Sequence, residues 1–144
     1  MPKSIINELT NIPTTYFFNE DELKCGGAKA KKEILKMLKN FVTLKDEEIT
    51  FASLNKTGEC FWFTPRAEIL KKDWIIILND YKNKEVDFIY VPKDTIKRSY
   101  LKTRMSSDNK LCLHLELQKK DGYIIDRKSK LNFTMDRLYI KVTY

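Results

Sequence analysis

Residues 74–78 read Trp-Ile-Ile-Ile-Leu, a run that is apolar on both faces of an extended strand. Successive side chains of a strand point to opposite faces of the sheet, so both faces of this strand must be buried. The run therefore predicts a central, fully buried strand. A second apolar strand is expected at 86–91, after a turn at 79–84, and Pro92 ends it.

Alternation of apolar and polar residues is strictest between 111 and 118. Leucine occupies every second position from Leu111 to Leu117, and polar residues or cysteine fill the others. This period of two indicates a strand with one buried and one polar face. Further strands are expected at 48–54, 59–64, 123–126 and 139–144, with a hairpin turn at 55–58. A turn at 119–122 predicts that the C-terminal region forms an antiparallel meander.

One long helix is expected at 28–41. Ala30, Ile34, Leu38 and Phe41 recur at helical spacing and form an apolar stripe, while four lysines share the opposite side. A short second helix is expected after Asp94, which is a suitable N-cap residue. The helix pattern therefore predicts one amphipathic element with a cationic face and one shorter element.

The chain has 144 residues, with only 4 Gly and 4 Pro, so it offers little linker sequence. We expect a single α+β domain over 25–144, with a mixed or antiparallel sheet, preceded by an N-terminal arm at 1–24. No 18-residue apolar run is present, which predicts no membrane span. The N-terminus has no signal-peptide pattern, and three widely spaced cysteines suit a reducing compartment. A cytoplasmic location is the resulting prediction.

Positive charge is concentrated in the last third of the chain. Residues 1–92 carry 14 Lys and Arg against 14 Asp and Glu, whereas residues 93–144 carry 13 against 6, which accounts for the net charge of +7. A basic segment joined to a neutral one is typical of proteins that bind a polyanion. An acidic surface of a partner protein would explain the same charge.

Three groups of basic residues are the candidate nucleic-acid contacts. Tyr100 and Tyr123 lie near two of them and are expected to stack on bases if the partner is single-stranded. Only five of the 27 basic residues are arginine, the usual bidentate reader of guanine, so backbone binding is expected more than base readout. The candidates are Lys29, Lys32, Lys36 and Lys39 on the helix, then Lys97, Arg98, Lys102 and Arg104, then Arg127, Lys128 and Lys130.

Several enzyme classes are excluded by the residues themselves. His114 is the only histidine, and no serine stands in a G-x-S-x-G pattern, so a serine hydrolase triad is absent. Four glycines in the whole chain do not supply a Gly-rich phosphate loop. Carboxylates remain as a route to catalysis, because two or three acids and a lysine suffice for metal-dependent phosphodiester hydrolysis.

The order of segments resembles the restriction-endonuclease-like PD-(D/E)XK nucleases. The matching segments are Asn55-Lys56-Thr57 before Cys60-Phe61-Trp62-Phe63, then 73–79, then Phe88-Ile89-Tyr90-Val91-Pro92, within residues 28–104. In that family a lysine-bearing strand is followed by such a Trp-bearing strand and by an apolar strand that ends in proline. The resemblance implies a DNA-directed protein from a restriction or mobile-element setting.

The family's metal-binding motif is not intact in this sequence. Leu54 stands where the acid before Lys56 is expected. A second alignment places Pro92-Lys93-Asp94 with Glu116-Leu117-Gln118, and Lys119 follows. The resemblance therefore implies Asp94, Glu116 and Lys119 as the candidate catalytic residues, with Mg²⁺ as the cofactor of a nuclease.

The leading hypothesis is a nucleic-acid-binding domain without a cofactor, directed at the backbone of DNA. The first alternative is a Mg²⁺-dependent endonuclease of the PD-(D/E)XK type, and the question of an enzyme stays open. The second alternative is a small inhibitor or adaptor that binds an acidic protein through its basic surface.

Overall fold

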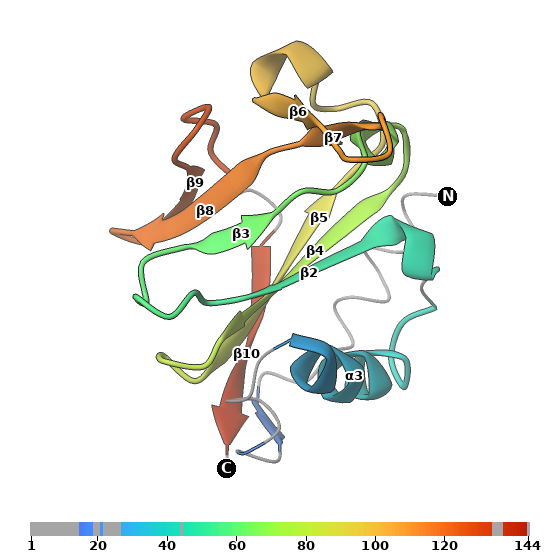
Figure 1. The fold of residues 1–144 in the computed structure, drawn as a ribbon. Helices are drawn as coiled ribbons and strands as arrows, with labels where there is room; N and C mark the ends of the chain where they lie inside the picture. The colour runs from blue at the N-terminus through green and yellow to red at the C-terminus, as the bar shows by residue number, and fades with distance from the viewer. Residues whose placement is uncertain (1–14, 19–20, 22–26, 44, 134–136, 144) are drawn as a thin grey trace.

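A computed structural model describes residues 15–18, 21, 27–43, 45–133 and 137–143. Its elements run from the N-terminus to the C-terminus of the chain (Figure 1). They are β1 (Thr15–Phe17), α3 (Gly27–Leu38), η1 (Asp46–Glu48), β2 (Ile49–Ser53), β3 (Phe61–Phe63), η2 (Ala67–Lys71), β4 (Trp74–Asp80), β5 (Glu85–Val91), η3 (Arg98–Tyr100), β6 (Thr103–Met105), β7 (Leu111–Leu113), β8 (Leu115–Lys120), β9 (Tyr123–Asp126) and β10 (Arg137–Thr143).

The largest sheet has five strands in the order β1-β10-β5-β4-β2. β4 and β5 form its antiparallel centre, β10 pairs antiparallel with β5, and β2 pairs parallel with β4. Every residue of β4 is buried, as expected for a run that is apolar on both faces. The prediction that this strand lies at the centre of the fold is therefore confirmed.

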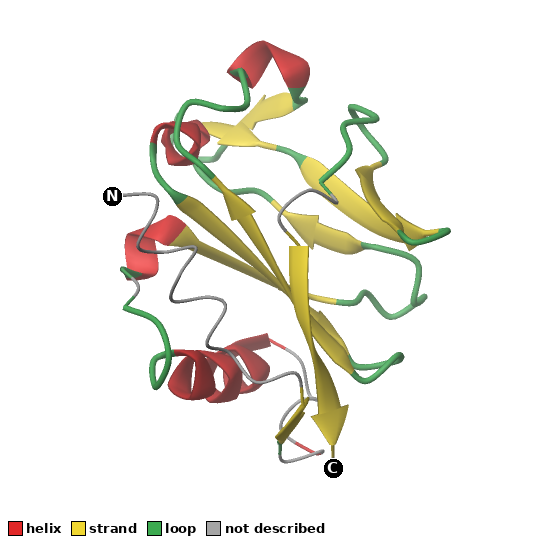
Figure 2. Ribbon diagram, turned by 180° about the vertical axis from the view of Figure 1, so that it is seen from behind, coloured by secondary structure: helices red, strands yellow, loops and turns green. Residues whose placement is uncertain are grey.

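The central sheet lies between a helix and a second sheet. On one face, Ile75 and Ile77 of β4 pack with Ile34 of α3 in one hydrophobic cluster. On the other face, Ile76 and Leu78 belong to a second cluster, together with the inward leucines of β8. That β8 strand is the centre of the three-stranded sheet β3-β8-β9. Figure 2 shows the helix on one side of the long strands and the smaller sheet on the other.

Trp74 anchors the side of the core that faces the second sheet. Its indole Nε1 donates a hydrogen bond of 2.8 Å to Thr50 Oγ1, which satisfies the one polar atom of a fully buried side chain. Its ring meets Phe63 and Phe133 edge-on, at centroid distances of 6.4 and 6.5 Å. Residues from three separate segments therefore meet at this tryptophan.

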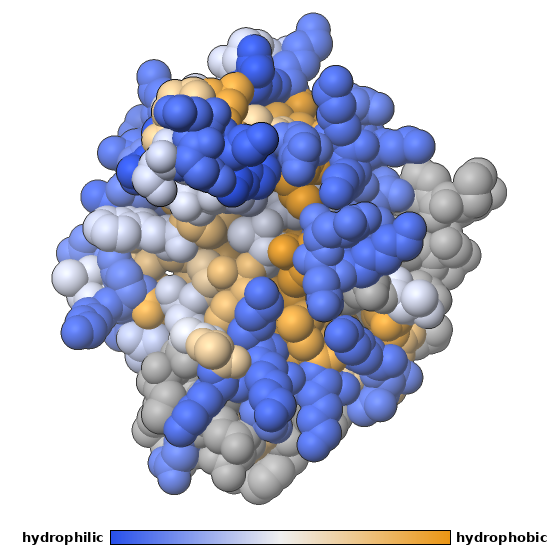
Figure 3. Space-filling model, turned by 45° about the vertical axis from the view of Figure 1, so that its right-hand side comes forward, coloured by the Kyte–Doolittle hydropathy of each residue, from blue (hydrophilic) through white to orange (hydrophobic). Residues whose placement is uncertain are grey.

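β2 is the edge strand of the central sheet. Ile49 and Phe51 are only partly buried there, and they line a cavity of about 480 Å³ together with charged residues of η1 and η2. Figure 3 views this side of the molecule and shows hydrophobic surface in the centre, bordered by hydrophilic side chains. Charged neighbours of this kind discourage another strand from pairing with an exposed edge.

The α+β class is confirmed, and most expected strands are present within a few residues of their predicted bounds. The expected second helix is wrong. The segment after Asp94 is a loop with one 3-10 turn, η3, and Asp94 itself has a left-handed φ of 61° instead of a helix-capping conformation. α3 ends at Leu38, shorter than predicted, because residues 39–41 form a turn. α3 is the one α-helix whose bounds lie within the described residues.

Two expected connections also differ. The turn at 55–58 is present, and Leu54 and Phe61 form an antiparallel bridge across it. It does not join two strands of one sheet, however, because β2 belongs to the central sheet and β3 to the second sheet. The C-terminal region is not a simple meander: β8 and β9 pair antiparallel, but β10 returns to the central sheet beside β5. Because each connection changes sheets, the two sheets share one core.

Most of the predicted arm at 1–24 lies outside the described residues. Its residues 15–17 form β1, which pairs parallel with β10 at the edge of the central sheet. No described helix has the length and apolar character needed to cross a membrane. Cys60 and Cys112 are buried free thiols, and Cys25 lies outside the described residues.

Candidate functional site

The three predicted groups of basic residues lie on different parts of the molecule. Lys29, Lys32 and Lys36 are exposed on α3. Lys39 is exposed in the turn that follows the helix, and its Nζ lies 3.5 Å from Asp46. α3 is at the opposite end of the molecule from η3 and β6, where the second group lies (Figure 1). The helix lysines therefore do not extend the surface formed by the second group.

The second group borders a wide groove. Lys97 and Arg98 line an open cavity of about 1010 Å³ between η2 and the loop that leads to η3. Arg104 is exposed on β6, and Lys102 is exposed just before it. Both follow Arg98 by only a few residues in the sequence. The lining residues are Arg66, Ala67, Glu68, Leu70, Lys71, Asp94, Ile96, Lys97, Arg98, Lys110 and Leu111.

The groove lining carries five cationic side chains against two carboxylates. All seven are exposed, whereas Leu70 at its base is buried. Within the described part of the chain, Lys71, Lys97 and Arg98 form no ion pair, so their ammonium and guanidinium groups are available to an anion. A backbone hydrogen bond of 3.0 Å from Asp94 N to Leu70 O joins the two sides of the groove.

Arg66 is the groove residue whose geometry is most constrained. Its two terminal nitrogens donate to the two carboxylate oxygens of Asp108, at 3.1 and 2.8 Å. Ser106 also donates to Asp108. These hydrogen bonds, that from Arg66 first and that from Ser106 second, hold the pKa of Asp108 well below its usual range. The pair ties the start of η2 to the turn between β6 and β7.

Arg66, Lys71 and Lys110 were not identified from the sequence as part of a basic site. They join Lys97 and Arg98 only because η2, the loop after β5 and the turn before β7 meet in space. Each lies in a mixed segment and outside the three basic groups, and no spacing in the sequence relates them. Their common location is a property of the fold alone.

The third basic group lies on a loop held by a buried aspartate. Asp126 is fully buried and accepts hydrogen bonds from the backbone of Glu116, Lys128 and Ser129, and from the Ser129 hydroxyl at 2.6 Å. Arg127 and Lys128 themselves lie within 4 Å of carboxylates: Arg127 Nη1 is 3.7 Å from Glu59, and Lys128 Nζ is 3.8 Å from Glu116. Lys130 is exposed. Two of the three cations are thus partly neutralised in place.

The three candidate catalytic residues are not brought together. Asp94 is exposed on the loop after β5, beside the cationic groove. Glu116 pairs with Trp62 across β3 and β8, and Trp62 is 62% exposed, so Glu116 lies on the outer face of that sheet. Lys119 shares the inward face of β8 with Leu115 and Leu117, because residues two apart on a strand share a face. Glu116 and Lys119 therefore point in opposite directions.

Lys119 instead meets three acids that the sequence analysis did not single out. Its Nζ lies 2.8 Å from Asp80, from Glu85 and from Asp87. The β4–β5 pairing aligns Leu78 with Asp87 and Asp80 with Glu85, which puts all three acids on the face that looks toward β8. We call these four residues the buried lysine cluster. An acid that interrupts an apolar strand, as Asp87 does, was the available sequence signal.

Asp80, Glu85 and Asp87 have carboxylate oxygens within 4.8 Å of one another. Within the described residues, they are the one group of three His, Cys, Asp or Glu side chains that is close enough to bind a metal ion. The Lys119 ammonium already occupies the position among them that a divalent cation would take. Burial works to lower the pKa of Lys119, but the charge of Asp87 and hydrogen bonds to the acids outweigh it and raise that pKa. The cluster therefore contains its own cation, and a metal ion would have to displace it.

No family model, curated protein or solved structure matches this chain. The cationic groove, the basic loop at 127–130 and the buried lysine cluster are therefore the features that bear on its function. Of the three, the groove is open and contains three cations, Lys71, Lys97 and Arg98, that form no ion pair with a described residue.

Proposed function

We propose that this protein binds nucleic acid through the cationic groove, by contacts to phosphates of the backbone. The observation that supports this proposal is the lining of one open groove by five cations and two carboxylates. The excess of three positive charges lies on residues from three separate segments, so the fold concentrates charge at this place. A phosphate chain is the common biological polyanion with matching charge and extended shape.

The groove supports backbone binding better than base readout. Three of its five cations are lysines, which act as point charges, and one of its two arginines, Arg66, is already bidentate to Asp108. Each phosphate that is neutralised releases condensed counterions. The slope of log affinity against log salt concentration should therefore become more negative by about 0.7 to 0.9 for each contact. Three to five contacts in the groove therefore predict a total slope of roughly −2 to −4.5.

The test is binding of fluorescently labelled single-stranded and duplex oligonucleotides across a salt series. We expect the variant Lys97→Ala/Arg98→Ala to weaken binding and to reduce the salt slope by about 1 to 2. Lys32→Ala/Lys36→Ala on α3 is the matched control, because it removes the same number of exposed charges at the other end of the molecule. Absence of salt-dependent binding by the unmodified protein would overturn the proposal.

The endonuclease is a second candidate because one cluster holds the residue types that such chemistry uses. Three carboxylates and a lysine converge within hydrogen-bonding distance. We rank it below binding because Lys119 already neutralises these acids and two of them, Asp80 and Asp87, are fully buried. Scission of a plasmid on addition of Mg²⁺, lost in Asp87→Asn, would support it.

The inhibitor or adaptor hypothesis uses the same groove with a different partner. An acidic peptide would meet the same five cations, so the two partners compete for one surface. Tight binding of an acidic peptide with no binding of any oligonucleotide at low salt would replace the proposed function with this one.

A further inference from the structure

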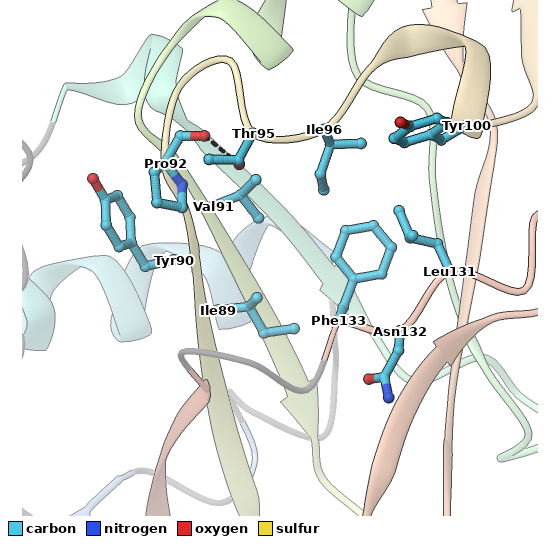
Figure 4. Close-up of a pocket in the computed structure, with 10 residues that line it drawn as sticks. All are labelled: Ile89, Tyr90, Val91, Pro92, Thr95, Ile96, Tyr100, Leu131, Asn132 and Phe133. Atoms are coloured by element: carbon cyan, nitrogen blue, oxygen red, sulfur yellow. Dashed lines mark hydrogen bonds between the residues drawn. The ribbon is translucent and has the colours of Figure 1, made fainter.

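A second cavity adjoins the cationic groove. It has a volume of about 280 Å³ and shares Ile96 with the groove, so the chain at 95–98 separates the two spaces. Figure 4 shows Ile96, Tyr100, Leu131 and Phe133 around this cavity, with Ile89 and Val91 of β5 behind them. Most of these side chains are aliphatic or aromatic.

We propose that this cavity accepts one unstacked base of a nucleic acid whose phosphates lie in the cationic groove. The inference rests on the proposed function and adds to it that the preferred partner is single-stranded. A base, its sugar and its phosphate form one short unit, so a binding site for it must place apolar and cationic surfaces side by side. The molecule has this arrangement at Ile96.

The sequence of the separating loop shows how the two surfaces are interleaved. Ile96 faces both spaces, the next two residues, Lys97 and Arg98, line the groove, and Tyr100 lines the cavity. Within five residues, this loop therefore places two cations in the groove and one aromatic ring in the cavity. A nucleotide held here would meet a positive charge at its phosphate and an apolar surface at its base.

Tyr100 is the side chain best placed to stack on a base. It is 53% exposed although it lies beside an apolar cavity, whereas Phe133 is buried and packs against Trp74. An aromatic ring at the mouth of a cavity offers one face to a planar ligand. Stacking on such a ring strengthens binding by about five- to 150-fold per base and tolerates every base, because each has a π-face.

Two polar groups of the cavity lining are already hydrogen-bonded within the protein. The Thr95 hydroxyl donates a hydrogen bond of 2.6 Å to Pro92 O. The Tyr90 hydroxyl donates to Asp73 at 3.1 Å, and Asp73 lies outside the cavity lining. The exposed Asn132 amide and the Tyr100 hydroxyl also belong to the lining, beside its apolar surface. Stacking on Tyr100 is the contact with the base that the experiment below tests.

Single strands are favoured because a base must leave its stack to enter the cavity. Extrusion from a duplex costs free energy of unpairing and unstacking, and this cost is least for single-stranded or mismatched nucleic acid. We therefore expect a single-stranded oligonucleotide to bind more tightly than a duplex of the same length, although the duplex has the higher charge density.

The experiment compares a labelled single-stranded 12-mer with a 12-mer of the same backbone in which every nucleotide is abasic. We expect the abasic strand to bind about tenfold more weakly, the lower part of the range for one stacked base. Tyr100→Ala should remove most of this difference and leave the salt slope unchanged, while Tyr100→Phe should retain it. Tyr123→Ala is the matched control, since Tyr123 is 52% exposed on β9, away from both cavities.

The outcomes separate this inference from the function on which it rests. Equal, salt-dependent binding of both strands would overturn the base pocket and leave backbone binding in the groove intact. Loss of the difference in Tyr123→Ala but not in Tyr100→Ala would also overturn it, because stacking would then occur on the outer sheet. No binding of either strand at low salt would overturn both proposals.

Discussion

Lys119 Nζ lies 2.8 Å from Asp87 Oδ2, and this contact joins the two sheets at the end of their shared core. Lys119 belongs to β8 of the second sheet, whereas Asp87 belongs to β5 of the central sheet. The leucines of β8 continue the same inward face, so one strand supplies both apolar and ionic contacts between the layers. The apolar core is thus closed at one end by charge.

Replacing Lys119 by methionine tests how much this contact contributes. Lys119→Met keeps the approximate length of the side chain but removes the ammonium group that contacts all three carboxylates. Removing one partner of a buried ion pair typically costs about 3–5 kcal/mol in the free energy of unfolding. Urea unfolding followed by circular dichroism measures this loss.

The matched control is Lys120→Met, which removes the same charge from the exposed neighbour. We expect it to change the free energy of unfolding by no more than about 0.5 kcal/mol. A similar small effect in Lys119→Met would mean that the acids are hydrated and that the cluster is not a structural contact between the sheets.

The same variant has a characteristic dependence on pH. The pKa of Lys119 is raised in the folded protein, so its contribution is fully present below the unfolded value of 10.5 and is lost only as the pH rises through the higher folded value. Lys119→Met lacks this titrating group. The stability difference between the two proteins should therefore be smaller at pH 11 than at pH 8.

Unfolding experiments at these two pH values provide the check. Lys120→Met measured alongside should differ from the unmodified protein by the same small amount at both. A stability difference for Lys119→Met that is larger at pH 11 than at pH 8 would have the wrong sign and would contradict the raised pKa of Lys119.

The strands were predictable because their apolar patterns are local. The assignment of strands to the two sheets was not predictable from the sequence. The run at 74–78 specifies a strand and its buried faces from neighbouring residues alone. The alternation at 111–117 locates extended chain in the same way, but the one strand expected there is two strands, β7 and β8, which belong to different sheets. Which sheet a strand joins depends on pairing over long distances, as between β10 and β5. The expected second helix is wrong for a related reason: apolar Ile96 and Leu101 are held by packing against the core, and not by helical periodicity.

The candidate site was predictable only in part, and for the same physical reason. Lys97 and Arg98 are adjacent in a basic segment and could be found from the sequence. Arg66 and Lys110 reach the groove through η2 and the β6–β7 turn, whose meeting is a tertiary contact. Likewise, Lys119 was identified as a candidate, but its acidic partners lie more than thirty residues away along the chain.

Asp126 should be essential for the shape of the basic loop at 127–130. It is fully buried, and its two carboxylate oxygens accept four hydrogen bonds, three of them from backbone nitrogens. Asp126→Ala leaves these donors without a partner, and each buried unsatisfied group costs about 1–3 kcal/mol. We expect the free energy of unfolding to fall by at least about 2 kcal/mol in urea unfolding.

A conservative control distinguishes the hydrogen bonds from the mere presence of a side chain. Asp126→Asn retains one acceptor oxygen and should lie between Asp126→Ala and the unmodified protein. If Asp126→Ala unfolds at the same urea concentration as the unmodified protein, the loop is held by other contacts.

Removing the charge of Asp108 should strengthen binding in the groove. Asp108 holds both terminal nitrogens of Arg66 and places a negative charge beside the groove. Asp108→Asn removes that charge and leaves the Arg66 guanidinium able to contact a phosphate, which adds up to one counterion-releasing contact. We expect the affinity for a single-stranded oligonucleotide to rise a few-fold at low salt, with a salt slope steeper by up to about 0.7.

The matched control for net charge is Asp121→Asn, which changes an exposed acid in the β8–β9 turn. It should leave both the affinity and the salt slope nearly unchanged. Weaker binding in Asp108→Asn would mean that the pair serves to hold the η2 side of the groove in place, so that its geometry matters more than the charge removed.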